Sequence, residues 1–292
     1  MSEAQKFSDS LAAAVEKAAK SIVSVNGRER FPATGVVWSA DGEILTADHV
    51  VERDEDVTVA LPDGSTHKAV VKGRDPGSDL ALLKIEAQGL TVPEFAEVKV
   101  GHLVFAVGRA QDLQADLSTV IALGGPVRGR RRSLEAYIQT GVTMYPGFSG
   151  GPLIDASGRV VGLNSSALAR GASLAVPVAV ARTIADALRK DGTLKRGFLG
   201  VVTQPVQLAE GVAAQLKQET GLMIIGAEKD GPADKGGLLQ GDVLVNVGGQ
   251  AVTDIGALQD ALGPETVGKA LTVKVVRGGE LKDVNVTVGA RE

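Results

Sequence analysis

Short apolar stretches separated by turn signals run through residues 21–164 and limit what the chain can fold into. The stretches are rich in Val, Ile and Leu, and turn signals such as residues 41–42 (DG) and 62–64 (PDG) stand between them. Regular short strands with this punctuation are typical of an all-β barrel or sandwich. The first two thirds of the chain are therefore predicted to be mostly β.

Helical spacing of apolar residues frames this β region. Residues 7–20 predict a lead-in helix with Ser8 as its N-cap, and residues 177–189 predict a second helix. The second helix runs into the polar segment 190–195, where we place a domain boundary. The predicted domains are residues 1–192, and residues 196–292, a small mixed α/β unit with helices near 207–217 and 254–262.

Composition excludes several classes of protein. The chain has 292 residues, 44% of them hydrophobic, which is enough for two cores. A formal net charge of −4 provides no basic surface for nucleic acid. Because there is no cysteine, a disulfide framework, a thiolate metal site and a cysteine nucleophile are all excluded.

The sequence also leads to two alternative expectations about the cellular compartment of the protein. No apolar run is long enough to span a bilayer, and the first residues lack the apolar core of a signal peptide. A cytoplasmic protein is expected from the sequence as written. A periplasmic or other extracytoplasmic location is expected instead if an export signal has been removed.

A serine lies among glycines in residues 145–153 (YPGFSGGPL). Glycines allow backbone conformations in which successive N–H groups point at one place, as an oxyanion hole requires. Ser149 is thus the candidate nucleophile, and the backbone of Gly147, Phe148 and Ser149 is the candidate oxyanion hole. The same pattern fits an ordinary glycine-rich turn or the nucleophile elbow of an α/β-hydrolase.

The order of residues along the chain separates these alternatives. His49, His67 and His102 are the only histidines, and all of them precede Ser149. An α/β-hydrolase has its histidine after the serine, so an esterase of that class is disfavoured. The subtilisin order begins with an aspartate, and the sequence around the acid argues against it. The remaining order, His then Asp then Ser, is that of chymotrypsin-type enzymes.

His49 and Asp79 are the candidates for the base and the acid. His49 follows the apolar stretch 44–47, and the end of a strand can hold a base rigidly near its nucleophile. The other two histidines lie on polar segments and are expected to face solvent. Asp79 opens an apolar stretch, where a buried carboxylate can orient the imidazole. Asp75 competes for this role but precedes a proline turn and is expected to be exposed.

Three segments together resemble the catalytic motifs of the HtrA (high-temperature-requirement A) serine proteases. They are residues 45–51 (LTADHVV), 79–84 (DLALLK) and 146–153 (PGFSGGPL). Residues 162–165 (GLNS) and 175–177 (AVP) are similar to family segments beside and after the substrate cleft. The resemblance implies a chymotrypsin-like double β-barrel followed by a small α/β PDZ domain.

Residues 198–201 (FLGV) resemble the peptide-carboxylate loop of the family's PDZ domain, and residues 241–244 (GDVL) resemble one of its middle segments. A PDZ groove binds an extended C-terminal peptide by strand addition. We expect residues 199–202 to form the pairing strand. Two leucines on the last predicted helix either face the peptide or pack in the core. The candidate peptide-binding residues are Phe198, Leu199, Gly200, Val201, Leu258 and Leu262.

The chain departs from the family pattern beside the nucleophile. The family usually has Asn-Pro-Gly-Asn-Ser-Gly-Gly where this chain has YPGFSGG, so the bulk of Phe148 is expected to alter the cleft. Thr143, six residues before Ser149, is expected near the floor of the primary specificity pocket, with Asn164 and Ser165 also in the pocket. An uncharged floor favours small or medium aliphatic residues before the cleaved bond.

The resemblance implies an ATP-independent endopeptidase of unfolded or misfolded polypeptides that needs no metal or cofactor. It also implies a homotrimer built around the N-terminal segment, with Phe7 as a candidate contact. The alternative is a proteolytically silent holdase chaperone or peptide-binding scaffold that keeps the protease fold. The basic run at residues 128–132 is interpreted as a solvated loop.

Overall fold

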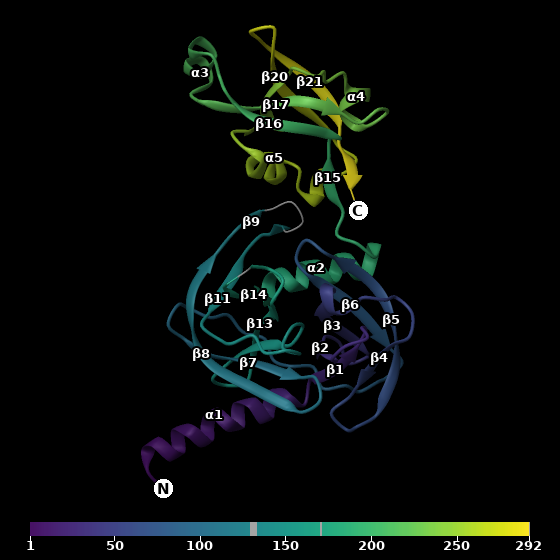
Figure 1. The fold of residues 1–292 in the computed structure, drawn as a ribbon, viewed down its shortest axis with the longest axis vertical. Coiled ribbons are helices and arrows are strands. Elements are labelled where there is room, and N and C mark those ends of the chain that lie inside the picture. The colour runs from purple at the N-terminus through teal and green to yellow at the C-terminus, as the bar shows by residue number, and fades with distance from the viewer. Residues whose placement is uncertain (129–132, 170, 292) are drawn as a thin grey trace. The chain divides into compact units, whose positions relative to one another are not determined.

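The β region of the chain forms two closed barrels, which confirms the predicted fold class (Figure 1). The computed structural model describes residues 1–128, 133–169 and 171–291. The chain divides into two compact units, Met1–Thr193 and Leu194–Glu292. Both barrels lie in the first unit, so the predicted catalytic residues all belong to it.

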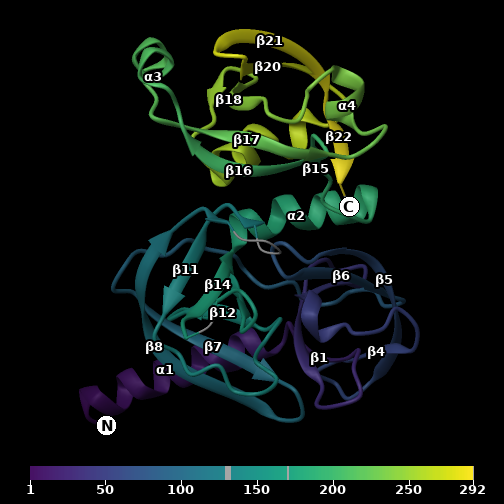
Figure 2. The same ribbon diagram turned by 45° about the horizontal axis from the view of Figure 1, so that its top comes forward.

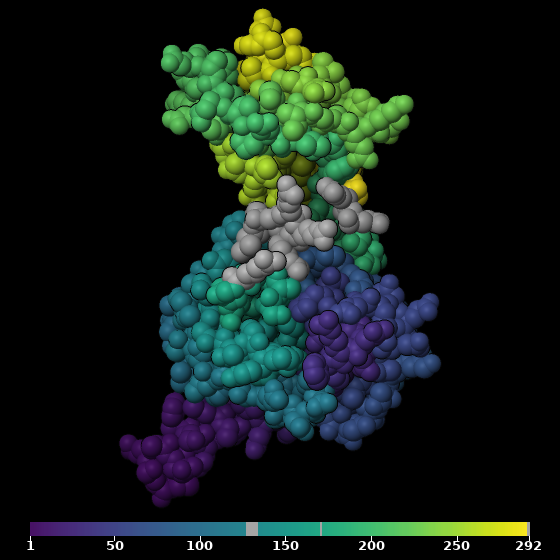
Figure 3. All heavy atoms as spheres, viewed as in Figure 1, coloured from purple at the N-terminus to yellow at the C-terminus, as the bar shows by residue number. Residues whose placement is uncertain are grey.

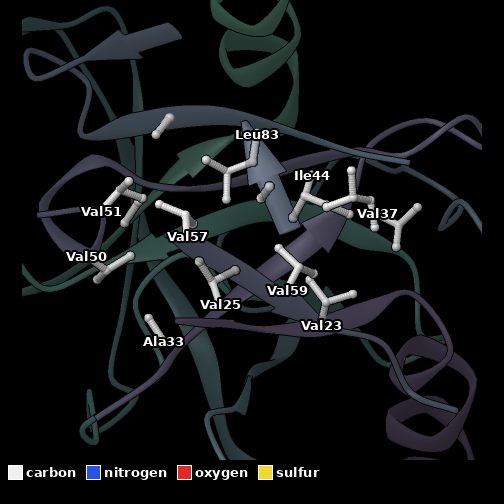
Figure 4. Close-up of a cluster of buried hydrophobic side chains, with 14 of the residues drawn as sticks. Val23, Val25, Ala33, Val37, Ile44, Val50, Val51, Val57, Val59 and Leu83 are labelled. Atoms are coloured by element: carbon white, nitrogen blue, oxygen red, sulfur yellow. The ribbon is translucent and has the colours of Figure 1, made fainter. Parts of the chain in front are cut away.

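The first barrel closes in the order β1-β2-β3-β6-β5-β4. Every residue of β2 and β3 is buried, because one face of each strand lines the barrel interior and the other is covered by the rest of the unit. Small β-branched side chains such as Val23, Val25 and Val59 fill the interior (Figure 4). The strands are β1 (Ile22–Asn26), β2 (Ala33–Val37), β3 (Glu43–Ala47), β4 (Val57–Ala60), β5 (Thr66–Asp75) and β6 (Leu80–Ile85).

The second barrel closes in the order β11-β14-β13-β12-β7-β8. Val104, Ile138 and Leu153 lie in its core. A two-stranded ribbon, β9 (Val127–Arg128) with β10 (Ser133–Leu134), extends from it. The barrel strands are β7 (Leu103–Arg109), β8 (Leu113–Gly124), β11 (Tyr137–Thr140), β12 (Pro152–Asp155), β13 (Val160–Ser165) and β14 (Ser173–Pro177).

The lead-in helix α1 spans Glu3–Ala19 and begins earlier than predicted. Its N-cap is Ser2, whose hydroxyl accepts the N–H of Gln5 at 3.2 Å, so the expectation that Ser8 caps it was wrong. The C-terminal half of α1 packs on the second barrel, whereas its N-terminal half projects from the unit (Figure 3). Phe7 lies on this projecting half and is 54% exposed.

Helix α2 (Val178–Asp191) follows the second barrel and ends at Gly192, which adopts a left-handed conformation. Its apolar face, with Ala181, Ile184 and Leu188, is buried. Arg189 near its end donates two hydrogen bonds of 2.7 Å to the carboxylate of Glu43 in the first barrel. The helix therefore ties the chain that leaves the second barrel back to the first.

The second unit is built on a sheet in the order β16-β17-β18-β20-β21, with β16 at one edge (Figure 2). Its helix α3 (Glu210–Leu216) is shorter than predicted, because residue 207 still belongs to β16. A further pair, β15 (Arg196–Phe198) and β22 (Gly289–Arg291), joins the two ends of the unit. The other elements are β16 (Val201–Gln207), β17 (Thr220–Ala227), α4 (Pro232–Gly236), β18 (Val243–Val247), β19 (Gln250–Ala251), α5 (Ile255–Ala261), the 3-10 turn η2 (Pro264–Thr266), β20 (Ala270–Arg277) and β21 (Glu280–Thr287).

A buried ion pair stabilises the second unit. The side chain of Asp242 is 1% exposed and accepts two hydrogen bonds of 2.7 Å from Arg277 and one of 2.8 Å from the N–H of Leu239. Burial alone would raise the pKa of Asp242, but these donors outweigh it and hold the pKa below its usual value. The pair thus contributes stability while Asp242 is ionised.

Replacement of Asp242 by Asn is expected to lower the unfolding temperature of the second unit by about 5 °C or more at pH 7. Because the folded-state pKa is depressed, this stabilisation is present above the unfolded pKa of about 4 and disappears as pH falls through the folded pKa. Calorimetry of the whole chain at several pH values measures it.

Asp283→Asn is the matched control, because Asp283 pairs with Lys274 at 2.8 Å but is 57% exposed. This control should change the unfolding temperature little. Equal losses in the two variants, or a loss in Asp242→Asn that persists in acid, would contradict the assignment.

Candidate active site

Strand pairing in the first barrel brings the candidate base and acid together. His49 lies in the 3-10 turn η1 (Asp48–Val50) directly after β3, and Asp79 directly precedes β6. The two strands are antiparallel neighbours, with Ala47 opposite Leu80. The N–H of Asp48 donates to the carbonyl of Asp79 at 3.0 Å, so the two side chains emerge from one point of the barrel.

The carboxylate of Asp79 is completely buried and holds His49 in one orientation. His49 Nδ1 lies 2.7 Å from Asp79 Oδ2, and the backbone N–H of His49 donates to Oδ1 at 3.1 Å. The hydroxyl of Ser165 also donates to Oδ2. This arrangement favours the imidazole tautomer with its proton on Nδ1, which leaves Nε2 free to accept a proton.

Asp75 does not compete for this position, and the expectation that it is exposed was wrong. It is 1% exposed. Its carboxylate accepts the N–H groups of Gly77 at 3.3 Å and Ser78 at 3.0 Å. Asp75 therefore closes the turn that delivers Asp79, which adopts a positive φ of 61°.

Arg74 fixes the loop that follows His49. Its guanidinium donates to the carboxylate of Asp48 at 3.2 Å and of Asp54 at 2.7 Å. It also donates to the carbonyls of Val51 and Arg53. Burial raises the pKa of Asp48 above its usual value even though Arg74 opposes the shift.

Ser149 reaches the same place from the second barrel. It is 6% exposed, and Gly150 donates its N–H to the carbonyl of Asn164 at 2.9 Å. Gly150 has a φ of +81°, and a Cβ on it would overlap Thr46 Oγ1 and lie 2.7 Å from the N–H nitrogen of Ala47. The turn that carries Ser149 therefore rests against the end of β3, just before His49.

The hydroxyl of Ser149 is bound to Ser166. The two Oγ atoms are 3.0 Å apart, and the backbone N–H of Ser166 donates to Ser149 Oγ at 3.3 Å. Within residues 1–128, 133–169 and 171–291, no hydrogen bond joins Ser149 to His49. The Ser149 hydroxyl is therefore engaged by Ser166 and not by His49 in this structure.

Residues 145–149, here named the nucleophile turn, present two free donors. The N–H of Phe148 donates to the carbonyl of Tyr145 at 3.1 Å and Gly147 has a φ of +94°, which together define a type II turn. Thr34 Oγ1 donates to the carbonyl of Gly147 at 2.6 Å. Among the described residues, neither Gly147 nor Ser149 donates its N–H to an acceptor. These are the groups that an oxyanion needs.

The side chain of Phe148 does not enter the cleft, contrary to the expectation from its size. It is 1% exposed and packs against Ala106, Val142 and Met144 in the second barrel. Its ring is buried because β7 presents glycine rather than a larger residue at position 108. Only the backbone of Phe148 lies in the nucleophile turn beside Ser149.

The residues expected in the substrate pocket have other contacts. Thr143 is exposed, and its N–H donates to the carboxylate of Asp116 at 2.6 Å. The amide of Asn164 is buried and donates to the carbonyls of Gly151 and Pro152 at 3.2 and 2.8 Å. The hydroxyl of Ser165 is bound to Asp79. Since both side chains are engaged, Ser165 and Asn164 could contact a substrate only through their backbone groups.

In the second unit, residues 199–202 overlap the edge strand β16 only at Val201 and Val202. Phe198 ends β15, and Gly200 has a φ of +75°. The carbonyl of Leu199 accepts the N–H of Ala233 at 2.8 Å. Three of the candidate side chains are at least 93% buried and pack in the core of the unit, namely Leu199, Leu258 and Leu262.

The remaining histidines lie away from the site. His102 is exposed, as expected. His67 is half-buried rather than fully solvated, and its Nε2 lies 3.1 Å from the hydroxyl of Ser65. Of the basic run, residues 129–132 lie outside the described residues.

Sequence reasoning missed Thr34, Asp116 and Ser166. Each contacts the site through a partner at least 17 positions away in the sequence, namely Gly147, Thr143 and Ser149. No local motif marks such residues. The run of serines at 165–166 was the one available signal, since two hydroxyls follow the strand beside the predicted cleft.

Comparison with known proteins agrees with this geometry. Residues 33–163 match the family model of the trypsin-like peptidase domain, and residues 197–288 match that of the PDZ domain. The chain is 38% identical over 264 residues to a probable periplasmic serine endoprotease DegP-like from Halomonas elongata, and 35% identical over 270 residues to one from Chlamydia pneumoniae. These alignments cover 88% and 89% of this chain but 56% and 55% of the relatives, so the chain spans about half of their length.

Solved structures show the same architecture. The HtrA-type protease AlgW with a decapeptide is 26% identical, with a TM-score of 0.81, and the match covers 97% of this chain and 99% of that one. A serine endoprotease from Yersinia pestis is 28% identical, with a TM-score of 0.79, over 97% and 98% of the two chains.

The two barrels and the second unit thus define a trypsin-like peptidase domain followed by a PDZ domain. In sequence the chain is similar to DegP-like serine endoproteases, and in fold it is similar to HtrA-type proteases. Among the described residues, no helix is both long and apolar enough to cross a membrane.

Ser166→Ala is expected to raise the rate at which a fluorophosphonate acylates Ser149. The substitution removes one of the two partners that hold the Ser149 hydroxyl, and a net hydrogen bond of about 1 kcal/mol corresponds to about fivefold in rate. Stopped-flow or gel-based labelling kinetics measure it. Ser166→Thr keeps the hydroxyl and should react as the native chain does, and an Ala variant slower than the Thr variant would contradict the assignment.

Proposed function

We propose that this chain is a serine endopeptidase that cleaves unfolded or misfolded polypeptides through Ser149, His49 and Asp79. The observation that carries the proposal is the buried Asp79 carboxylate, bound to His49 Nδ1 at 2.7 Å at the point where the nucleophile turn meets β3. A desolvated carboxylate paired in this way fixes the imidazole and stabilises its protonated form. Similarity to DegP-like endoproteases and to HtrA-type proteases supports the same chemistry.

The mechanism follows from the geometry. Ser149 Oγ leaves Ser166 and attacks the peptide carbonyl carbon while His49 Nε2 takes its proton. The oxyanion binds the N–H groups of Gly147 and Ser149. The C–N bond then breaks as His49 returns the proton to the amine. Water next attacks the acyl ester while His49 takes a proton from it, and His49 returns this proton to Ser149 Oγ as the acid product leaves. None of these steps calls on a metal or cofactor.

The hydrogen bond between Ser149 and Ser166 favours a second candidate, a holdase or scaffold that is proteolytically silent. In that state the chain binds unfolded segments without cutting them. The two candidates differ in whether Ser149 can be acylated.

The first test is labelling with a fluorophosphonate together with cleavage of unfolded casein. The native chain should label at one residue, and Ser149→Ala should abolish labelling and lower kcat by at least about 10³-fold. His49→Ala should have the same effect, whereas His102→Ala should not, because His102 is exposed and distant in the fold. A folded native chain that neither labels nor cleaves, with or without C-terminal peptides, would instead support the holdase.

We further propose that the PDZ domain regulates cleavage by binding C-terminal peptides at the edge strand β16. Its free edge can accept an added strand, and the glycine at position 200 lets the preceding loop turn its backbone toward a carboxylate. Leu258 on α5 and Leu262 at the end of α5 pack in the core of the domain and would support this edge from the inside. One solved relative is described as bound to a decapeptide, which is consistent with peptide recognition.

Location and assembly are proposals as well. The relatives are named periplasmic, which supports the extracytoplasmic expectation and gives no support to the cytoplasmic one. The homotrimer around the N-terminal segment stays a prediction. The 54% exposure of Phe7 on α1 is consistent with a contact there.

Cleavage of a peptide library is expected to show small or medium aliphatic residues before the cut bond. Thr143 is uncharged, and the nearby carboxylate of Asp116 is engaged by its N–H. The Asp116→Asn variant serves as the control and should leave the profile unchanged. A profile dominated by Arg or Lys that Asp116→Asn abolishes would show instead that this carboxylate sets the specificity.

A further inference from the structure

The side chain directly before the nucleophile joins the nucleophile turn to the core of the second barrel. Phe148 is 1% exposed and packs against Ala106, Val142 and Met144. Tyr145, at the start of the turn, contacts it edge-on with 5.6 Å between ring centroids. Such a ring cannot leave its site without exposing a large apolar surface to water.

The ring lies against β7 at a position that only glycine leaves open. A Cβ on Gly108 would overlap Phe148 Cδ1 and lie 2.9 Å from Cε1. The next residue, Arg109, donates its N–H to Thr34 Oγ1 at 2.7 Å, and this hydroxyl donates in turn to the carbonyl of Gly147 at 2.6 Å. Strand β7 therefore holds the nucleophile turn twice, through the ring and through Thr34.

These two attachments act on the part of the turn that presents the donors. Gly147 lacks a Cβ, so the peptide between Pro146 and Gly147 can flip between a type II and a type I turn. The flip would carry φ of Gly147 away from +94° and turn its N–H away from the oxyanion. Anchoring Phe148 on the C-terminal side of this peptide limits how far the backbone can adjust to the flipped form.

We propose that Phe148 is a positioning residue that keeps the nucleophile turn in its donor-presenting form in the free enzyme. Ser149 is then competent for acylation without an activating peptide. The proposal rests on the proposed protease function. It adds that Phe148, at a position where the HtrA proteases usually have Asn, keeps the oxyanion hole of this chain formed before substrate binds.

The test compares Phe148→Ala and Phe148→Leu with Phe105→Ala. Phe105 lies in β7, the strand against which Phe148 packs. It is 7% exposed and belongs to a separate cluster with Ile22 and Ile154. It is the matched core control. Phe148→Ala should lower kcat on casein by about 10- to 100-fold with KM within about threefold, because the lost donor acts on the transition state.

Phe148→Leu should recover most of kcat, since a large apolar side chain again fills the site. Phe105→Ala should lower the unfolding temperature comparably and leave kcat within about threefold at a temperature where all variants are folded. The proposal is overturned if Phe148→Ala keeps its kcat, or if the two Ala variants lose equal activity.

Amide hydrogen exchange provides a readout that does not require activity. Exchange of the hydrogen-bonded amides of Phe148 and Gly150 should accelerate in Phe148→Ala and stay unchanged in Phe105→Ala. If the native chain fails to react with a fluorophosphonate, the protease function fails while this measurement still tests the hold of the ring. Unchanged exchange of these two amides in Phe148→Ala would overturn the proposal whatever the activity.

Discussion

The antiparallel pairing of β3 with β6 is the constraint on which the site depends. It places the turn after β3 beside the residue before β6, so that His49 and Asp79 meet at 2.7 Å at one end of the first barrel. The barrel must close for this pairing to be rigid, and closure in turn buries Asp79 completely. Burial makes the carboxylate an effective partner for a protonated imidazole, because water cannot screen the interaction.

The second barrel holds the nucleophile against the first barrel through several short contacts from both backbone and side chains. Gly150 backs onto β3, Ser165 reaches Asp79, and Thr34 of β2 binds the carbonyl of Gly147. Each contact crosses from one barrel to the other. The relative placement of the candidate base and nucleophile is thus fixed by several short attachments, and the hydroxyl of Ser149 is held separately by Ser166.

Much of this could be predicted from the sequence, because the candidate catalytic residues sit in local motifs beside apolar stretches. His49, Asp79 and Ser149 were predicted as candidates from chain order and neighbouring residues. The punctuation of short strands predicted a barrel or a sandwich, and the resemblance to the HtrA proteases predicted the two barrels that the structure has. The start of α1 was misplaced because Ser2 and Ser8 are both acceptable caps. Asp75 was misjudged because its partners, the N–H groups of Gly77 and Ser78, carry no side-chain signal. The contacts that Thr34 and Asp116 make with the site depend on which strands become neighbours, and so does the burial of Phe148. Strand pairing of this kind cannot be read from a single sequence.

Gly150 and Ser149 are adjacent, but substitutions at the two positions have different consequences for the fold. Any side chain at Gly150 would overlap the backbone of β2 and β3 in a conformation with φ of +81°, so a substitution there would disturb the contact between the turn and these strands. Loss of the Ser149 hydroxyl removes only a group that rotates. A chain can therefore lose the Ser149 hydroxyl and keep its fold for another use, whereas a change at Gly150 acts on the packing between the two barrels.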